Sequence, residues 1–263
     1  MPFVDTNGIK MYYEVHGQGP AVVFAHPGGG NHLSWWQQVP ALAQSYTCIT
    51  FDHRGHGETR DFPRDDPGAV AYAQDLVGLL DHLGIQKTAI IGQSMGGWTG
   101  VGIAQICPER LSALVLSNST GGIRDPELDE HFAAVKTWHP RQLWAGAYAV
   151  DFAQREPARA FLYQQITRWN VHRPANLGAQ LEMVHDAEPL VRWRIPTLFV
   201  TGEHDSLIPP RLVDSVARQI PHAHVVRVPG TGHSPYFEKP EVWNRIVLEF
   251  LQSSNAKTDS VIT

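Results

Sequence analysis

A serine lies between two glycines in the segment "IIGQSMGG", residues 90–97 of the 263-residue chain. The segment follows an apolar run and precedes residues that suit a helix. A sharp turn from strand to helix would hold Ser94 in a strained conformation, and Gly92 and Gly96 would leave room where side chains collide. Such a serine can attack a carbonyl carbon. The pattern arises by chance in about one chain in ten of this length, and a tight turn also needs small residues, so partners are required.

A base and an acid follow two later apolar runs. His233 lies in the glycine-flanked loop "GTGHSP", where its imidazole could reach Ser94 and take the hydroxyl proton. Asp205, in "TGEHDS", could fix the tautomer of that imidazole. Glu203 is the competing carboxylate. We favour Asp205 because Glu203 is only one residue beyond Gly202 and has less reach over the sheet edge.

Backbone N–H groups would stabilise the negative charge that develops on the attacked carbonyl oxygen. One is the N–H of Met95, directly after the serine. The second is expected in the early loop "HPGGGNH", where the glycines allow close approach, and we assign it to Gly28. We interpret His26 as a structural residue that braces this loop.

The elements that must position these residues follow from hydrophobic patterning. "FVDTNGIKMYYEV" predicts a hairpin that turns at Asn7 and Gly8. Six short apolar runs predict buried strands, at 21–26, 47–52, 88–93, 113–118, 197–202 and 224–229. Amphipathic stretches separate most of them, as at 69–84, where Val70 begins an apolar face and Gly84 ends the helix. This alternation predicts an α/β fold, a mostly parallel doubly wound sheet of about eight strands. Ligands bind beyond the carboxyl ends of such strands.

Residues 121–194 contain helical patterns and no convincing strand, so we predict a helical cap inserted into a core of 1–120 and 195–252. Trp35, Trp98, Trp138 and Trp144 are candidates for the substrate pocket, although aromatic side chains more often pack a core. Residues 253–263 are polar and aperiodic, and we expect a disordered tail.

Composition excludes several classes of function. The net charge is −5, and the 21 basic residues form no block that would follow a nucleic-acid backbone. No apolar run approaches the roughly 20 residues that span a bilayer, and "MPFVDTNG" lacks a secretory signal, so we expect no membrane association and a cytoplasmic location. Cys48 and Cys107 lie in apolar stretches, which predicts buried thiols rather than a disulfide framework or a metal site.

Taken in order, these motifs resemble the α/β-hydrolase family, and the resemblance covers essentially the whole chain. It rests on "HPGGG" at 26–30, "FDHRGHGET" at 51–59, "GQSMGG" at 92–97, "GEHD" at 202–205 and "GTGH" at 230–233. Two features depart from the family pattern: Pro27 follows the loop histidine where glycine is common, and Glu58 and Thr59 replace a glycine-x-serine ending. Asp52 and Arg54 are interpreted as braces of their turn.

The resemblance implies a serine hydrolase that works through an acyl-enzyme without cofactor or metal. Its nearest branch is that of small esterases and enol-lactonases, which implies a carboxylic ester or lactone of small to medium apolar character. A carbon-carbon bond hydrolase of aromatic breakdown and a slow-turnover ligand receptor that keeps the triad stay open as alternatives. The expected partner is a small-molecule substrate, and a homodimer is the assembly considered.

Overall fold

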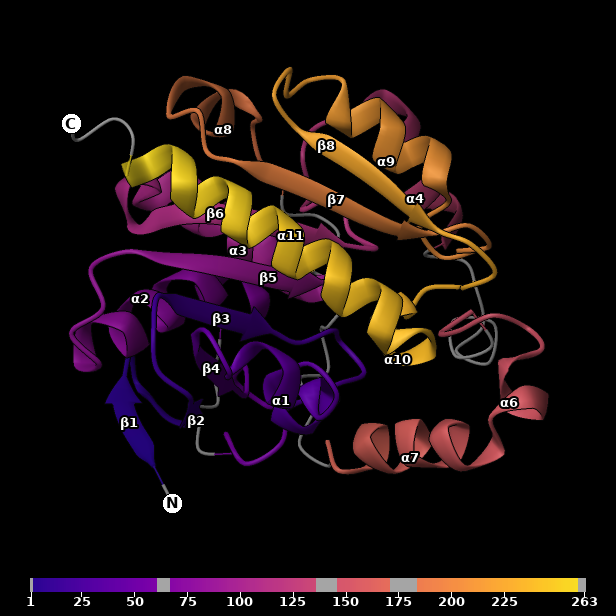
Figure 1. The fold of residues 1–263 in the computed structure, drawn as a ribbon, viewed down its shortest axis with the longest axis horizontal. Coiled ribbons are helices and arrows are strands. Elements are labelled where there is room, and N and C mark those ends of the chain that lie inside the picture. Colours follow the sequence, from indigo (N-terminus) through magenta and orange to yellow (C-terminus); the bar gives the residue numbers. More distant parts are fainter. Residues whose placement is uncertain (1, 61–66, 136–145, 171–183, 260–263) are drawn as a thin grey trace.

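The computed structural model describes residues 2–60, 67–135, 146–170 and 184–259 (Figure 1). Within these residues, eight strands form one sheet in the order β1-β2-β4-β3-β5-β6-β7-β8. The strands are β1 Phe3–Thr6, β2 Ile9–His16, β3 Ala21–Ala25, β4 Thr47–Phe51, β5 Thr88–Gln93, β6 Leu111–Ser117, β7 Thr197–Gly202 and β8 His224–Val228. Each predicted strand is therefore present, with bounds that differ by two residues at most.

The first two strands form the predicted antiparallel hairpin at one edge of the sheet. Asn7 and Gly8 both adopt positive φ angles, 46° and 76°, as a two-residue hairpin turn requires. β2 pairs antiparallel with β4, and all later pairs are parallel. The carboxyl ends of the parallel strands consequently meet at one edge.

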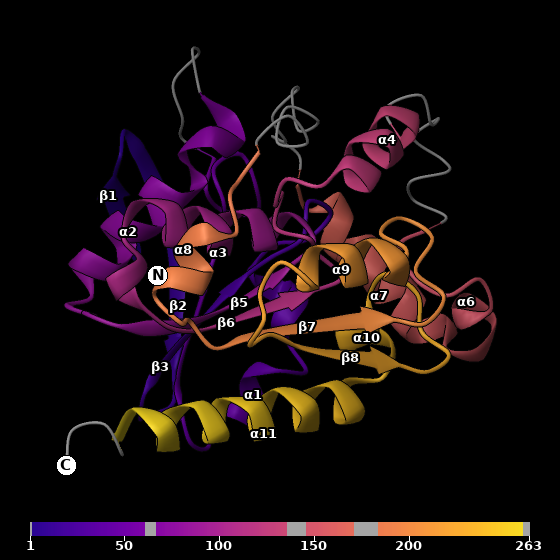
Figure 2. The same cartoon turned by 90° about the horizontal axis from the view of Figure 1, so that it is seen from above.

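Helices cover both faces of the sheet. Figure 2 shows α1 and α11 along one face and α2, α3, α8 and α9 along the other. Strand side chains alternate between the two layers: Ile90 packs in the core beneath α2 and α3, whereas Ile91 packs in the core beneath α1 and α11. The helices and 3₁₀ turns are η1 His32–Trp35, α1 Val39–Leu42, η2 Gly68–Ala71, α2 Tyr72–His82, α3 Met95–Ile106, η3 Pro108–Arg110, α4 Pro126–Val135, α6 Phe152–Arg155, α7 Pro157–Arg168, α8 Glu188–Arg192, α9 Pro210–Ala217, α10 Pro235–Glu238 and α11 Pro240–Asp259.

Two local predictions were wrong. Val70 lies in a 3₁₀ turn before α2 and is 62% exposed, because the helix starts two residues later than its apolar pattern suggests. We expected a disordered tail from residue 253, but α11 continues to Asp259. Residues 253 to 259 are therefore helical. Gly84 does follow the end of α2, with φ 67°.

The described residues between 121 and 194 contain α4, α6, α7 and α8 and one isolated bridge between Ile123 and His185. Figures 1 and 2 both place α6 and α7 beyond the carboxyl ends of the parallel strands. This is where a cap would cover a site, and the exact bounds of the cap remain a prediction. No helix in the described ranges is long and apolar enough to cross a bilayer.

Candidate active site

Ser94 occupies the turn between β5 and α3 in a strained conformation. Its φ is 49° and its ψ is −114°, and its side chain is half-buried. The flanking glycines are required by space: a Cβ on Gly92 would lie 2.4 Å from the carbonyl oxygen of Gly96, and a Cβ on Gly96 would lie 1.9 Å from that of Ala25. The N–H of Ser94 donates to the carbonyl of Ser117 at 2.9 Å, which anchors the turn to β6.

His233 and Asp205 are brought together by the loops that follow β8 and β7. Nδ1 of His233 lies 2.8 Å from Oδ2 of Asp205, and both residues are buried. The other carboxylate oxygen accepts the backbone N–H groups of Leu207 and Ile208 at 2.9 and 3.0 Å. Nδ2 of Asn118, just after β6, donates to Oδ2 of Asp205 at 2.7 Å. The aspartate is thus held with one oxygen toward the imidazole.

Glu203 faces away from this pair. Its side chain is 51% exposed and accepts the N–H of Gly230 at 2.9 Å, with His204 3.6 Å away. The structure therefore selects Asp205 over Glu203 as the imidazole's carboxylate.

The loop that carries His233 is tied both to the elbow and to the cap region. Nε2 of Gln93, the residue before the serine, donates to the carbonyl of His233 at 2.6 Å. Glu238 accepts the N–H groups of Gly232 at 2.9 Å and Ser234 at 3.3 Å, on either side of the histidine. It also accepts the N–H of Ala149 at 3.0 Å, and burial raises the pKa of its carboxyl. Glu238 therefore fixes the backbone from which the imidazole projects.

The early glycine loop presents a defined N–H group. The carbonyl of Pro27 accepts the N–H of Gly30 at 2.8 Å and lies 2.8 Å from Nδ1 of His26. Because the N–H and C=O of a trans peptide point in opposite directions, these bonds direct the N–H of Gly28 away from the loop's interior. Pro27 has no N–H, so Gly28 is the first residue after His26 that can supply a backbone donor. Met95 begins α3, where backbone N–H groups lack helical partners.

His26 braces this loop as a neutral imidazole. Its Nε2 accepts the backbone N–H of His53 at 3.0 Å and lies 2.9 Å from Nδ1 of the same residue. Nε2 of His53 in turn lies 2.9 Å from Oγ1 of Thr99. Burial lowers the pKa of both imidazoles well below the usual range for histidine. The structural interpretation of His26 agrees with these contacts.

The turn after β4 is braced as the sequence predicted. Asp52 accepts the N–H of His32 at 2.6 Å and that of Glu58 at 2.8 Å. Arg54 forms a buried ion pair with Asp75, with Nε 2.7 Å from Oδ2. Thr59 compensates for the unusual ending of its motif, because its hydroxyl donates to the Asp52 carbonyl at 2.9 Å.

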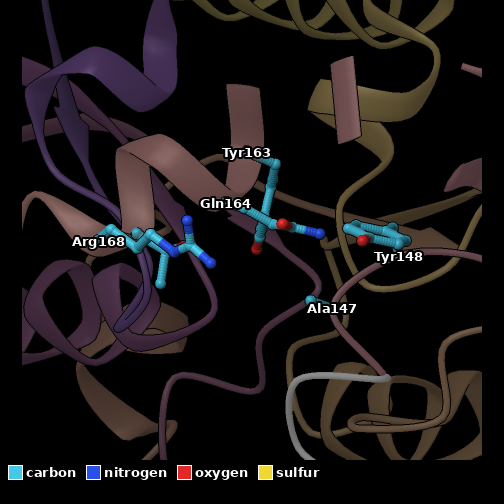
Figure 3. Close-up of a pocket in the computed structure, with 6 residues that line it drawn as sticks. Ala147, Tyr148, Tyr163, Gln164 and Arg168 are labelled. Carbon is cyan, nitrogen blue, oxygen red and sulfur yellow. The ribbon is translucent and has the colours of Figure 1, made fainter. Parts of the chain in front are cut away.

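A cavity of about 360 Å³ lies along α7 (Figure 3). Arg168 and Gln164 extend from α7 toward the space that faces Tyr148. The hydroxyl of Tyr163 lies 3.3 Å from Oγ of Ser234, next to the candidate base. Tyr163 and Thr167 also line a narrower space with Gly29, Gly30 and aromatic residues. Tyr163 and Thr167 therefore connect the cavity to the glycine loop, and Tyr163 also connects it to the histidine loop, whereas Ser94 and His233 are not among the residues that line it.

The tryptophans proposed for the pocket have different positions. Trp35 is fully buried, with ring centroids 5.1 Å from Phe24 and 5.0 Å from Tyr236, so its assignment to the pocket was wrong and it packs the core. Trp98 is 3% exposed and packs against Phe132 with the two rings tilted, which leaves little surface for a ligand. Trp138 and Trp144 lie outside the described residues.

Sequence reasoning missed three polar residues that act behind the site: Asn118, Glu238 and Asn170. Asn118 has a detectable signal, since it ends a buried strand at the edge where ligands bind. Glu238 lies near His233 in the chain but resembles a surface residue. Asn170 lies in a polar stretch, and its contacts come from residues more than 100 positions away.

Comparisons with known proteins identify the family of the chain. The family model described as the alpha/beta hydrolase family matches residues 22–246. The chain belongs to the alpha/beta hydrolase family. Among the described residues of this hydrolase, no cluster of three His, Cys, Asp or Glu side chains could hold a metal ion. Cys48 is a buried free thiol, as expected, whereas Cys107 is free and partly exposed.

Relatives of this hydrolase differ in their named substrates. An esterase from Thermogutta terrifontis is 25% identical with a TM-score of 0.81, over 96% of this chain and 98% of that one. The enol-lactonase from Burkholderia xenovorans LB400 is also 25% identical, with a TM-score of 0.78 over 95% and 100% of the two chains. The 2-hydroxy-6-oxo-6-(2'-aminophenyl)hexa-2,4-dienoic acid hydrolase of Metapseudomonas resinovorans is 27% identical over 95% of this chain and 90% of its own.

Proposed function

We propose that this hydrolase cleaves carboxylic esters or lactones through an acyl-enzyme, with Ser94 as nucleophile, His233 as base and Asp205 as the orienting acid. The observation that carries the proposal is the buried pair of His233 and Asp205, with the carbonyl of His233 bonded to Gln93, the residue before Ser94 in the strained elbow. Nucleophile, base and orienting group are the parts that acyl transfer requires.

The chemistry follows from these positions. Nδ1 of His233 bonds to Asp205, so Nε2 is the nitrogen that can take the Ser94 proton as Oγ attacks the substrate carbonyl. The N–H groups of Gly28 and Met95 then bind the oxyanion. Collapse of the tetrahedral intermediate expels the alcohol, which receives the proton from His233. Water, deprotonated by the same imidazole, attacks the acyl-enzyme and releases the acid and Ser94.

The substrate class is supported by the cavity and by the relatives. Tyr148 and Tyr163 provide aromatic walls beside the histidine loop, which suits an apolar acyl or aryl group. The esterase and the enol-lactonase are similar over nearly the whole chain. Both act on acyl-oxygen bonds by name, so esters and lactones are the substrates to test first.

A second candidate function is the hydrolysis of a carbon-carbon bond in an unsaturated oxo acid. The observation that favours it is Arg168, whose guanidinium extends toward the cavity where a substrate carboxylate could bind. The relative from Metapseudomonas resinovorans is named for such an acid.

The proposal is tested by stopped-flow hydrolysis of p-nitrophenyl butyrate at enzyme concentrations that resolve one equivalent of product. We expect a burst followed by steady release. In Ser94→Ala the rate should fall at least about 10³-fold with the fold intact, since no other group can replace the nucleophile. The 2-hydroxy-6-oxo-hexadienoic acid is assayed alongside by loss of its absorbance.

The outcomes separate the candidates. Steady ester turnover that depends on Ser94 supports the esterase. Turnover of the dienoic acid alone favours the carbon-carbon hydrolase, and one equivalent of product with no further release favours the receptor. Near-normal ester hydrolysis by Ser94→Ala would reject Ser94 as nucleophile in every one of these functions.

A further inference from the structure

Asn170 joins the carboxyl end of α7 to two loops of the candidate site. Its Nδ2 donates to the carbonyls of Gly29 at 3.2 Å and Gly30 at 2.9 Å. Its Oδ1 accepts the N–H of Gly57 at 2.9 Å and Nδ2 of Asn31 at 3.1 Å. The side chain is only 8% exposed. These four bonds use every donor and acceptor position of the amide.

The orientation of the amide is fixed by its partners. The carbonyl oxygens of Gly29 and Gly30 can only accept, and the N–H of Gly57 can only donate, so Nδ2 must face the glycine carbonyls. A carboxylate at this position would place an oxygen against two carbonyl oxygens.

The hydrogen bond to Gly29 is the first in a chain of hydrogen bonds that leads to the N–H of Gly28. The peptide unit that carries the Gly29 carbonyl also carries the N–H of Gly30, which donates to the carbonyl of Pro27 at 2.8 Å. The peptide unit of that Pro27 carbonyl carries the N–H of Gly28. Asn170 is therefore connected to the proposed oxyanion donor through two successive peptide units. Aligned hydrogen bonds of this kind polarise one another.

The glycine loop needs such an external support. Gly28, Gly29 and Gly30 follow one another, and glycine has more backbone freedom than any other residue. An oxyanion donor that is not held in place must be ordered during the reaction, which removes the advantage of preorganisation.

The same contacts bind α7 itself. Nδ2 of Asn31 donates to the carbonyl of Ile166 at 2.9 Å, in the last turn of the helix. Asn31 and Asn170 thus attach the end of α7 to the glycine loop through buried bonds.

We propose that Asn170 is a positioning residue that sets the direction of the Gly28 N–H, so that the helical segment before it takes part in forming the oxyanion hole. The inference rests on the proposed function. It predicts that changes at Asn170 weaken stabilisation of the transition state more than substrate binding.

The test compares Asn170→Ala and Asn170→Asp with the wild type, using p-nitrophenyl butyrate turnover, melting temperature and inhibition by phenylboronic acid. Boron accepts the Ser94 oxygen and becomes a tetrahedral anion, so its inhibition constant reports the oxyanion site. We expect kcat to fall roughly 10- to 100-fold while KM changes by less than about threefold. The inhibition constant should rise in parallel with the loss of kcat.

The aspartate variant separates positioning from packing, because it has the same shape as asparagine. A purely structural role predicts a lower melting temperature with near-normal kcat and inhibition constant in folded Asn170→Asp, and that result would overturn the inference. Asn244→Asp is the matched control: Asn244 is 9% exposed and donates to the carbonyl of Gln37 at 3.0 Å. We expect Asn244→Asp to have the kcat and the inhibition constant of the wild type.

Asn31→Asp provides a second route if either variant fails to fold. It removes the donor to Asn170 and Ile166 but keeps Oδ1, which accepts the N–H of Leu33 at 3.0 Å. Loss of kcat and of boronate affinity in this variant supports the inference, and retention of both rejects it. Ser94→Ala is assayed in parallel. If that variant keeps its activity the proposed function fails, whereas a dead Ser94→Ala beside unaffected Asn170 variants rejects the inference alone.

Discussion

At the scale of single residues, the carboxylate of Asp205 has donors at four positions. Leu207 and Ile208 hold one oxygen, while Asn118 and His233 contact the other. The three donors other than the imidazole leave the carboxylate one orientation, toward Nδ1 of His233. This arrangement favours the tautomer with the proton on Nδ1 and leaves Nε2 free to act as the proposed base.

We predict that Asp205→Asn lowers kcat roughly 10²- to 10⁴-fold, because an amide can donate to Nδ1 and favour the wrong tautomer. The variant should still fold, since its size is unchanged. Steady-state turnover of the best ester, with circular dichroism as the check on folding, measures this.

Glu203→Gln is the control for Asp205→Asn. The Glu203 side chain is half exposed and bonds to Gly230, so its loss should change kcat by less than about twofold. A strong defect in Glu203→Gln beside mild behaviour of Asp205→Asn would transfer the acid's role to Glu203.

At the scale of elements, the elbow depends on how closely α3 approaches β3. Gly96 lies in the first turn of α3, and a Cβ there would overlap the carbonyl oxygen of Ala25 at the end of β3. The added Cβ would be fixed to the backbone of residue 96 and would meet a backbone oxygen, so neither partner can rotate away. The helix would have to shift, and Ser94 would move with it.

Gly96→Ala is therefore predicted to lose stability by roughly 1–3 kcal/mol or more, and kcat by roughly 100-fold. Urea unfolding and ester turnover measure the two effects. Gly102→Ala is the matched change on the same helix, where the nearest atom is the Ala73 Cβ at 2.9 Å, a side-chain contact. It should keep activity within about twofold, and equal losses in both variants would argue against the specific role of Gly96.

At the scale of the whole molecule, the buried histidines link stability to pH. Burial lowers the pKa of His26 and of His53 well below 6.5 in the folded protein. Below pH 6.5 the unfolded chain binds protons at these positions and the folded protein does not. The free energy of unfolding must therefore fall as the pH falls through this window.

We predict that these two histidines lower the free energy of unfolding by about 1 kcal/mol each between pH 6.5 and 5.5. The lowered pKa of His185 adds to this fall, and the raised pKa of His32 opposes it. Urea titrations across this range measure the slope. His53→Gln should reduce the slope by about half, whereas His224→Gln, at an exposed position, should not change it. A stability that does not change with pH in the wild type would contradict the neutral state of the pair.

The sequence predicted features that depend on local pattern. The strands were found because runs such as "TAIIGQ" are buried on both faces of the sheet, and their carboxyl ends located Ser94, Asp205 and His233. The errors arose where tertiary contacts decide. Trp35 is an aromatic residue near the glycine loop, as a pocket residue could be, but it packs between Phe24 and Tyr236. The last helix, α11, continues through polar residues that the sequence pattern assigned to a tail. The contacts of Asn170 could not be predicted, since they are made with loops that are distant in the chain.

The attachment of α7 to the glycine loop has a consequence for protein engineering. Helical segments of related hydrolases are natural units to exchange when a new substrate preference is wanted. In this chain, a graft that ends at Arg168 would join a foreign α7 to the native Asn170. A graft that extends past residue 170 would replace the side-chain amide of Asn170 and its bonds to the glycine loop. Chimeras of this hydrolase should therefore treat Asn31 and Asn170 as one inseparable pair, carried together or left together.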